Sequence, residues 1–216
     1  MVLIGYWPLQ ENSGNTAHDY AGSNNGAVNG AQQGAEGLVG STAYRFDGDY
    51  VDLQTTIGNP AQNHSLSAWI NTNDSSSQGV IFGQRDTNDG DDARFIVLRG
   101  DRGGRINFRT YDGSNYIARS SKGFNDGVWH HVVAVKDPNL KIYIDGNLEG
   151  TASGGSPSVN DSDFIGARGG SGGNDRFFDG RIAEVRFYNH ALSQAEISYL
   201  YNVVNQGRLT SVKKSV

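Results

Sequence analysis

The chain contains no cysteine and no uninterrupted apolar run of ~18 residues. The first absence excludes disulfide bonds and zinc-thiolate sites, although it leaves the redox compartment undetermined. The second indicates that no membrane-spanning helix is encoded. The segment that starts at Met1 also lacks the basic residues that open a signal peptide. We therefore expect that a leader has been removed or that the chain is exported by another route.

The chain also has fewer basic than acidic residues. The chain has 18 Lys and Arg residues against 23 Asp and Glu residues, which gives a formal net charge of −5. Proteins that bind nucleic acid carry a basic stripe, so we expect no nucleic-acid partner. Hydrophobic residues make up only 36% of the chain, in part because 30 residues are glycine. Apolar residues are nevertheless spread evenly, which favours a folded domain over disorder.

Short apolar segments recur roughly every ten residues, a spacing typical of β-sandwiches and jelly rolls. A length of 216 residues fits one large domain of this kind. Two turns, Asp47-Gly48-Asp49 and Asp145-Gly146, have the composition of tight hairpins. We expect strands at residues 3–9, 43–46, 50–53, 66–70, 79–83, 95–98, 106–111, 129–135, 141–144 and 147–150.

The last ordered third of the chain joins a strand to a capped helix. Residues 182–188 alternate apolar and polar side chains, the pattern of a half-buried strand. Ser193 and Glu196 have the spacing of a capping box, and Leu192 and Ile197 have that of a hydrophobic staple. A short amphipathic helix is therefore expected to close an all-β domain.

Five segments follow one another in a recognisable order. They are Gly5–Leu9 with Asp19–Gly22, Phe46–Val51, Leu66–Ile70, Trp129–Val132 with Tyr143–Gly146, and Gly180–Asn189 with Ala191–Ser193. Together they resemble the laminin-G-like jelly-roll family, within the concanavalin-A-like lectin and glucanase superfamily. The resemblance covers residues 4 to about 203.

The resemblance implies an all-β fold: a two-sheet antiparallel jelly-roll sandwich with one short C-terminal helix. One sheet would be concave, with loops at the rim. We expect the domain to span residues 1–204, and residues 205–216 to form a C-terminal tail or linker. Because this fold hosts many unrelated sites, function has to be argued from individual residues.

The first candidate site is a calcium position in the loop that begins at Asp19. Ca²⁺ takes six to eight oxygen ligands from carboxylates, amides and backbone carbonyls. The loop supplies the Asp19 carboxylate, the Asn24 and Asn25 amides, and a flexible carbonyl at Gly22. The resemblance implies that this loop lies near the closing strand, where Glu184 or a neighbouring carbonyl would complete the shell.

The site departs from the family's pattern at Ala183, where the family commonly shows Asp. The alternative interpretation is an Asx turn, in which Asp19 accepts hydrogen bonds from its own backbone. Ca²⁺, as a structural ion rather than a catalytic one, is the cofactor expected from the sequence.

A second acidic stretch runs from Asp86 through Asp89 to Asp92, between two predicted strands. Its spacing loosely resembles that of calcium loops, but no helix pair flanks it as in an EF-hand. If the stretch is a site, it would lie at the rim of the sandwich, with Arg85 in reach of a ligand. The alternative is a solvated, self-repelling loop.

A sugar site is predicted at Tyr111 to Tyr116. Sugar binding needs an aromatic ring for the apolar face of a pyranose and planar polar groups for its hydroxyls, and this stretch adds Asp112 and Asn115 to its two tyrosines. Asp175 is expected to face it from another loop. Alternatively, the two tyrosines form a cross-strand aromatic pair.

Signs of catalysis are mostly absent. Retaining glucanases of the superfamily carry a Glu-x-Asp-x-x-Glu strand with two carboxyl groups ~5 Å apart, and none of the chain's glutamates begins such a motif. G-x-S-x-G and H-E-x-x-H are missing as well. His130 and His131 are neighbours in one strand and face opposite sides, so we expect one in the core and one exposed. We predict that the protein is not an enzyme.

These observations predict a non-catalytic carbohydrate-binding or adhesion module that is extracellular or on a cell or virion surface. Its expected partner is a glycan or another cell-surface ligand, reached through the rim loops or the concave sheet. A first alternative is a structural decoration or receptor-binding protein whose partners are protein subunits. A second is a polysaccharide-degrading hydrolase or lyase with an unfamiliar carboxylate pair.

Overall fold

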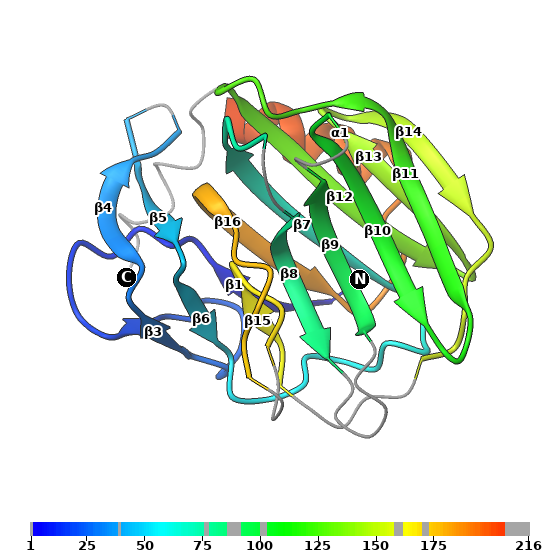
Figure 1. The fold of residues 1–216 in the computed structure, drawn as a ribbon, viewed down its shortest axis with the longest axis horizontal. Coiled ribbons are helices and arrows are strands. Elements are labelled where there is room, and N and C mark those ends of the chain that lie inside the picture. Colours follow the sequence, from blue (N-terminus) through cyan, green and yellow to red (C-terminus); the bar gives the residue numbers. More distant parts are fainter. Residues whose placement is uncertain are drawn as a thin grey trace.

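The computed structural model describes residues 2–38, 40–75, 78–85, 92–99, 103–157, 162–169 and 173–205, with the backbone alone at 85, 92–95 and 97–99. In this part of the chain, two eight-stranded antiparallel sheets pack face to face (Figure 1). The predicted all-β sandwich is therefore confirmed. Residues 206–216, predicted as a tail or linker, lie outside the described part.

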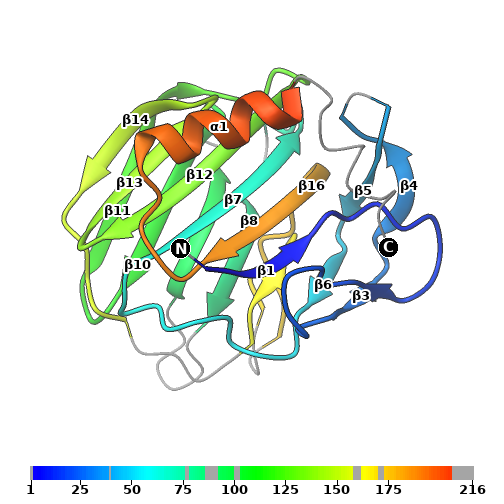
Figure 2. The same cartoon turned by 180° about the vertical axis from the view of Figure 1, so that it is seen from behind.

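The first sheet, called sheet A, has the order β14-β13-β12-β7-β16-β5-β4, and β1 also pairs with β16. The C-terminal helix α1 crosses the outer face of this sheet (Figure 2). The elements are β1 (Leu3–Trp7), β4 (Gln32–Glu36), β5 (Thr42–Asp47), β7 (His64–Asn71), β12 (Trp129–Asp137), β13 (Asn139–Ile144), β14 (Asn147–Ala152), β16 (Asp179–Tyr188) and α1 (Gln194–Asn205).

The second sheet, called sheet B, has the order β11-β10-β9-β8-β15-β6-β3-β2. Its strands β8 to β11 lie on the side of the sandwich away from α1 (Figures 1 and 2). The elements are β2 (Thr16–Ala17), β3 (Gly26–Asn29), β6 (Tyr50–Asp52), β8 (Gln78–Arg85), β9 (Asp92–Arg99), β10 (Arg105–Tyr111), β11 (Asn115–Gly123) and β15 (Phe164–Ile165).

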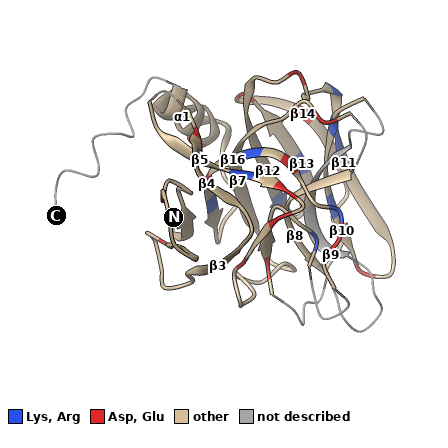
Figure 3. Ribbon diagram, turned by 60° about the vertical axis from the view of Figure 1, so that its left-hand side comes forward, with Lys and Arg blue, Asp and Glu red and all other residues tan. Residues whose placement is uncertain are grey.

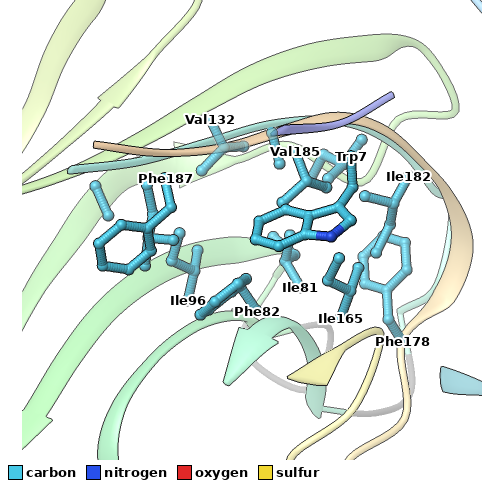
Figure 4. Packing of buried hydrophobic residues seen from close by; sticks show 14 of the residues in the cluster. Trp7, Ile81, Phe82, Ile96, Val132, Ile165, Phe178, Ile182, Val185 and Phe187 are labelled. Carbon is cyan, nitrogen blue, oxygen red and sulfur yellow. The ribbon is translucent and has the colours of Figure 1, made fainter. Parts of the chain in front are cut away.

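The main core fills the space between the two sheets. Trp7, fully buried, lies in the middle of it, between Val185 of β16 and Ile81 of β8 (Figure 4). Its indole N–H donates to the carbonyl of Asn24, 2.9 Å away. Burial of each large apolar side chain contributes about 1.5–3 kcal/mol, so this layer supplies most of the force that holds the sheets together.

Strand β16 is buried on both faces, and the prediction of a half-buried strand is wrong. Its register against β7 shifts between Ala183 and Arg186, and Glu184 has a φ of 57° there. This bulge adds one residue to the strand and breaks the strict alternation. Val185 points into the main core, whereas Glu184 and Arg186 both lie on the outer side, beneath other elements.

The predicted helix cap is confirmed. The Ser193 N–H donates to the Glu196 carboxylate at 2.6 Å, and the Glu196 N–H faces the Ser193 hydroxyl at 3.4 Å. Leu192 and Ile197 are buried in one cluster between α1 and sheet A, as the hydrophobic staple requires. Among the described elements there is no helix with the length and apolar character needed to cross a membrane.

One of the two predicted hairpins forms. Asp145 and Gly146 have φ values of 51° and 81°, and they join β13 to β14 in a tight turn. Asp47-Gly48-Asp49 does not join a hairpin, because β5 belongs to sheet A and β6 to sheet B. Phe46 and Val51, on either side of this turn, both point into the main core. The chain crosses between sheets here so that both can be buried.

Candidate functional site

The carboxylate of Asp19, the first predicted calcium ligand, is enclosed by N–H groups. Its Oδ1 accepts hydrogen bonds from the backbone N–H groups of Tyr6 (2.8 Å), Ala21 (2.9 Å) and Gly22 (3.1 Å). Its Oδ2 accepts from the backbone and the side-chain nitrogens of Asn24, both at 3.1 Å. Burial by itself would raise the pKa of Asp19, but these backbone N–H groups hold it below its ordinary value.

The other predicted ligands in this loop are engaged as well. The side-chain oxygen of Asn25 accepts from the Asp19 N–H at 2.9 Å. A Cβ on Gly22 would come within 2.9 Å of the Asp19 carboxylate, so the loop backbone closes tightly around it. The loop is thus built around a carboxylate that stabilises its turn.

Glu184 lies in a separate, buried cluster on the outer side of sheet A. It forms an ion pair with Arg186 (2.5 Å) and accepts from the Tyr6 hydroxyl (2.8 Å) and the Gln10 amide (3.0 Å). The Arg186 guanidinium also lies over the Tyr6 ring, 4.4 Å from its centroid. Burial and the neighbouring Glu184 raise the pKa of the Tyr6 hydroxyl, which therefore stays a hydrogen-bond donor.

As folded, this donor set does not fit a calcium shell. A cation at Asp19 would have to replace N–H donors, and Glu184 already balances the charge of Arg186. Across the described residues, no group of three or more His, Asp or Glu side chains is placed to hold a metal ion. The geometry is that of the Asx turn, and calcium at this loop stays a prediction.

The predicted sugar site at the β10–β11 hairpin is divided between two faces of sheet B. Tyr111 pairs with Asn115, while Thr110 pairs with Tyr116. Thr110 is fully buried and Tyr116 packs against the main core. Because neighbouring pairs point to opposite faces, Tyr111 and Asn115 share the outer face and Tyr116 faces inward. The register also excludes the alternative of a Tyr111–Tyr116 cross-strand pair.

Asp112 anchors this hairpin to the segment that follows β14. Its carboxylate accepts from the Ser156 N–H at 2.8 Å and from the Ser114 N–H at 3.3 Å. The contact requires a glycine at 155, where a Cβ would lie 2.7 Å from the Asp112 carboxylate and 2.6 Å from the Tyr116 ring. Asp112 therefore holds two loops together at the rim of the sandwich.

Asp175 has a similar role in another loop. Arg168 donates to it through Nε at 2.6 Å and through Nη2, and the backbones of the two residues also exchange hydrogen bonds of 2.9 Å. The pair closes the chain segment between β15 and β16. These partners belong to its own loop and not to the β10–β11 hairpin.

The third predicted group is largely beyond the described residues. Asp86 and Asp89 lie outside them, and Arg85 is described only as the last residue of β8. The prediction that this acidic loop binds a ligand stays untested.

Residues that the site prediction missed lie on the outer face of sheet B. Arg119 of β11 is paired with Asn107 of β10, and its Nε donates to the Asn107 side chain at 3.2 Å. Arg105 and Arg119 are both exposed. The alternation of buried and exposed residues in β10 is visible in the sequence, so the outward position of Arg105 was within reach of prediction.

His130 is clamped between two carboxylates. Its Nδ1 lies 2.7 Å from Asp145 and its Nε2 lies 3.1 Å from Asp126. Burial by itself would lower the pKa of His130, but the two carboxylates raise it above the ordinary value. The imidazolium form therefore joins the loop before β12 to the β13–β14 turn.

His131 points to the other side of β12, beneath α1. Its Nε2 lies 2.8 Å from the Ser67 hydroxyl, and its ring stacks on Trp69 with centroids 5.1 Å apart. Burial, with the nearby charge of Arg186, lowers the pKa of His131 to about 3. Both histidines are thus buried, and the prediction that one is exposed is wrong. The Ser67–His131 pair is closed to any substrate because both residues are buried.

Three solved structures illustrate what the fold is similar to. The first is domain 4 of AbnA, an extracellular GH43 arabinanase of Geobacillus stearothermophilus, in complex with arabinotriose. It has a TM-score of 0.71 at 21% identity, over 93% of this chain and 98% of that domain.

The botulinum neurotoxin serotype D binding domain (TM-score 0.66, 17% identity) is covered over 51% of its length, by 93% of this chain. Trypanosoma rangeli sialidase (TM-score 0.66, 15% identity) is covered over 33% of its length, by 95% of this chain. This chain thus spans about half of the toxin domain and a third of the sialidase. At these identities the three structures show the fold alone.

No curated protein sequence matches the chain. A laminin-G-like family model, described as the concanavalin A-like lectin/glucanases superfamily, matches residues 46–198. That match spans most of the sandwich, from the end of β5 into α1. The chain therefore belongs to the laminin-G-like family of the concanavalin A-like lectin/glucanases superfamily.

Proposed function

We propose that the protein is a non-catalytic carbohydrate-binding module that acts outside the cell. The observation that carries the proposal is the outer face of the β10–β11 hairpin, where Tyr111 and Asn115 lie side by side. An aromatic ring beside an exposed amide is the pair of groups that a sugar ring requires: one apolar surface, and a donor and acceptor for hydroxyls. The arabinanase domain solved with arabinotriose supports the same class of ligand by analogy.

The buried carboxylates support a binding role over a catalytic one. Asp19 and Glu184 accept hydrogen bonds from several protein groups. Asp163, fully buried, accepts from the Ile57 N–H at 2.6 Å. A hydrolase of this superfamily needs one carboxyl group free to protonate the leaving group and a second facing the sugar. These three carboxylates instead hold loops and strands in place.

A glycan array that includes neutral and acidic oligosaccharides tests the proposal. We expect selective binding to a subset of glycans, and a loss of at least about tenfold in affinity for Tyr111→Ala, because a stacked aromatic ring supplies a large share of such contacts. Incubation with the bound glycan should release no shorter product. Turnover of the glycan, or an array without any binding, would contradict the proposal.

A structural role on a virion or cell-surface layer is the alternative. It predicts a stable oligomer in solution and no glycan binding. Size-exclusion chromatography with light scattering, run on the same sample as the array, separates the two. Calcium binding at the Asp19 loop stays a prediction separate from this proposal, because the proposed sugar-binding residues Tyr111 and Asn115 do not belong to that loop.

A further inference from the structure

The outer face of sheet B over β10 and β11 carries positive charge on an acidic protein. Arg105 and Arg109 of β10 and Arg119 of β11 occupy outward positions, because the residues between them, such as Ile106, Phe108 and Ala118, point into the main core. The outward residues of these two strands include no Asp or Glu. Figure 3 shows the blue stretches of β10 and β11 on the side of the sandwich away from α1.

The exposed arginines do not balance acidic groups of the fold. Among the described residues, neither Arg105 nor Arg119 forms an ion pair with a carboxylate. Two carboxylates lie at the margins of the face, and both accept hydrogen bonds from uncharged groups of the chain. Glu149 accepts from the Ser121 N–H at 3.1 Å and from the Ser121 hydroxyl, and Asp112 accepts from backbone N–H groups.

Arg119 is held in position over the middle of β10. Its Nε donates to the side chain of Asn107, which is itself only 2% exposed and lies midway along β10 between Arg105 and Arg109. A guanidinium fixed through Nε keeps its terminal nitrogens available as a planar donor pair, the geometry that matches a carboxylate. Such preorganisation costs little side-chain entropy on binding.

The spacing of the arginines favours a ligand with repeated charges. Arg105 and Arg109 are four residues apart in one strand, which separates their backbones by about 13 Å. Arg119 lies between them on the neighbouring strand. A sugar with a single terminal acid would engage one of these groups, whereas a chain with an acid on each unit would engage several. Tyr111 and Asn115 extend the same face toward the hairpin.

We propose that the outer face of β10 and β11 binds a polyuronate: an oligosaccharide whose successive sugar units carry carboxylates. This inference rests on the proposed function and adds the class of glycan and the face that takes it. The other outer face is not available in the same way, because α1 crosses sheet A (Figure 2) and the outward residues Glu184 and Arg186 of β16 are buried and paired with each other.

The test is calorimetric titration of the full chain with hexagalacturonate at low salt. We expect binding that weakens as sodium chloride is added, because exposed charges are screened. Arg105→Gln and Arg119→Gln should each weaken binding roughly tenfold, and the double variant roughly a hundredfold. The control is Arg45→Gln, which makes the same charge change on β5, where Arg45 lies 3.6 Å from Asp47 and from Asp179. It should bind like the original chain.

Three further probes fix the ligand class. The methyl ester of hexagalacturonate keeps the sugar chain but loses the charge, and it should bind at least tenfold more weakly. The singly charged 3′-sialyllactose should also bind weakly. A heparin hexasaccharide, which carries sulfates, should not compete at equal concentration. Tighter binding of either acidic probe than of hexagalacturonate would overturn the choice of a polyuronate.

The outcomes separate this inference from the proposed function. If hexagalacturonate binds the double variant as tightly as it binds the original chain, the outer face of β10 and β11 is not the binding site, although the module still binds glycans. If neutral oligosaccharides such as arabinotriose bind and hexagalacturonate does not, the ligand class is wrong and the proposed function stands. If no glycan binds at all, both fail. Melting curves of each variant exclude misfolding as the cause of a loss.

Discussion

Arg186 on sheet A and Arg119 on sheet B both project from the outer face of a sheet, but their surroundings differ. Arg186 is buried, paired with Glu184 and stacked on Tyr6. Arg119 is exposed, its Nε donates to the neutral side chain of Asn107, and it forms no ion pair among the described residues. The difference arises because Tyr6 of β1 and Glu184 enclose Arg186, whereas Arg119 is exposed in the part of the chain that the structure describes. The same residue type thus stabilises the fold on one side and is exposed to solvent on the other.

The largest effect is expected from Arg186→Ala. It leaves the Glu184 carboxylate buried without its counter-charge, which should cost about 3–5 kcal/mol of unfolding free energy. For a chain of this size the melting temperature should fall by roughly 10 °C. Thermal and urea denaturation measure both quantities.

The control for this change is Arg45→Ala, which removes an exposed arginine of the same sheet. Its charged partners are exposed as well, so the cost should stay below about 1 kcal/mol. Equal losses of unfolding free energy in the two variants would contradict the difference that we draw between buried and exposed arginines.

Asp19→Ala should have an intermediate effect, about 1–3 kcal/mol, because the N–H groups that surround the carboxylate lose their acceptor. With an Asx turn, EDTA leaves the melting temperature of the original chain unchanged. A melting temperature that falls with EDTA, and a loss of that response in Asp19→Ala but not in Asp126→Ala, would instead establish calcium at this loop.

Acid should weaken the Asp19 loop in the original chain. The pKa of Asp19 is lowered by the surrounding N–H groups, so its contribution is present above the unfolded pKa, near 4. The contribution is lost as the pH falls through the lower folded value. Between about pH 5 and pH 2, a range that brackets the usual carboxyl pKa, the Asp19→Ala variant should therefore lose less stability than the original chain. Denaturation curves recorded across this range measure the difference.

The two histidines of β12 predict opposite pH effects. The folded pKa of His130 is raised by Asp145 and Asp126, so its contribution is complete below about 6.5 and is lost as the pH rises through the folded value. The folded pKa of His131 is lowered to about 3, so its contribution is complete above about 6.5 and is lost as the pH falls toward that value. His130→Gln should flatten the decline in stability above neutral pH. A variant with the original alkaline decline would contradict this assignment.

The smallest effect on stability is expected from Arg119→Gln. Its side chain is exposed and neutralises no carboxylate among the described residues, so unfolding free energy should change by no more than about 0.5 kcal/mol. The same variant should weaken hexagalacturonate binding. A large loss of stability would mean that Arg119 stabilises the fold, as Arg186 does.

The strands that the sequence predicted have apolar residues at regular intervals, as in β7 and β12. Five described strands were missed: β2, β3, β4, β11 and β15. The last three were missed for different reasons. β4, Gln32–Glu36, has no β-branched or aromatic residue, and it forms because it adds to the edge of β5. β15, Phe164–Ile165, is too short to show a period and exists only between β6 and β8. β11, Asn115–Gly123, was not predicted because its inward residues, Ala118 and Ser120, are small or polar and give no apolar alternation.

The sequence predicted which residues belong to the candidate sites, but it did not predict their partners in the fold. The sequence identified Asp19, Asp112 and Asp175 as acidic groups in loops, which they are. Their oxygens, however, face N–H groups or an arginine of the protein itself. Which partner a loop carboxylate finds depends on segments distant in the sequence, such as Tyr6 for Asp19 and Ser156 for Asp112. Tyr111 was predicted as a ligand residue, and the β10–β11 register then separated it from Tyr116.

The fold class, the family, the capped C-terminal helix and the Asp145-Gly146 hairpin could all be predicted, because their signals lie in residues close together in the chain. The crossing between sheets at Asp47-Gly48-Asp49 and the burial of β16 on both faces became visible in the folded protein. The difference between the two outer faces did so as well. These features depend on elements that are distant in the sequence and pack over the surface of a sheet. The local pattern of apolar and polar residues contains no information about those elements.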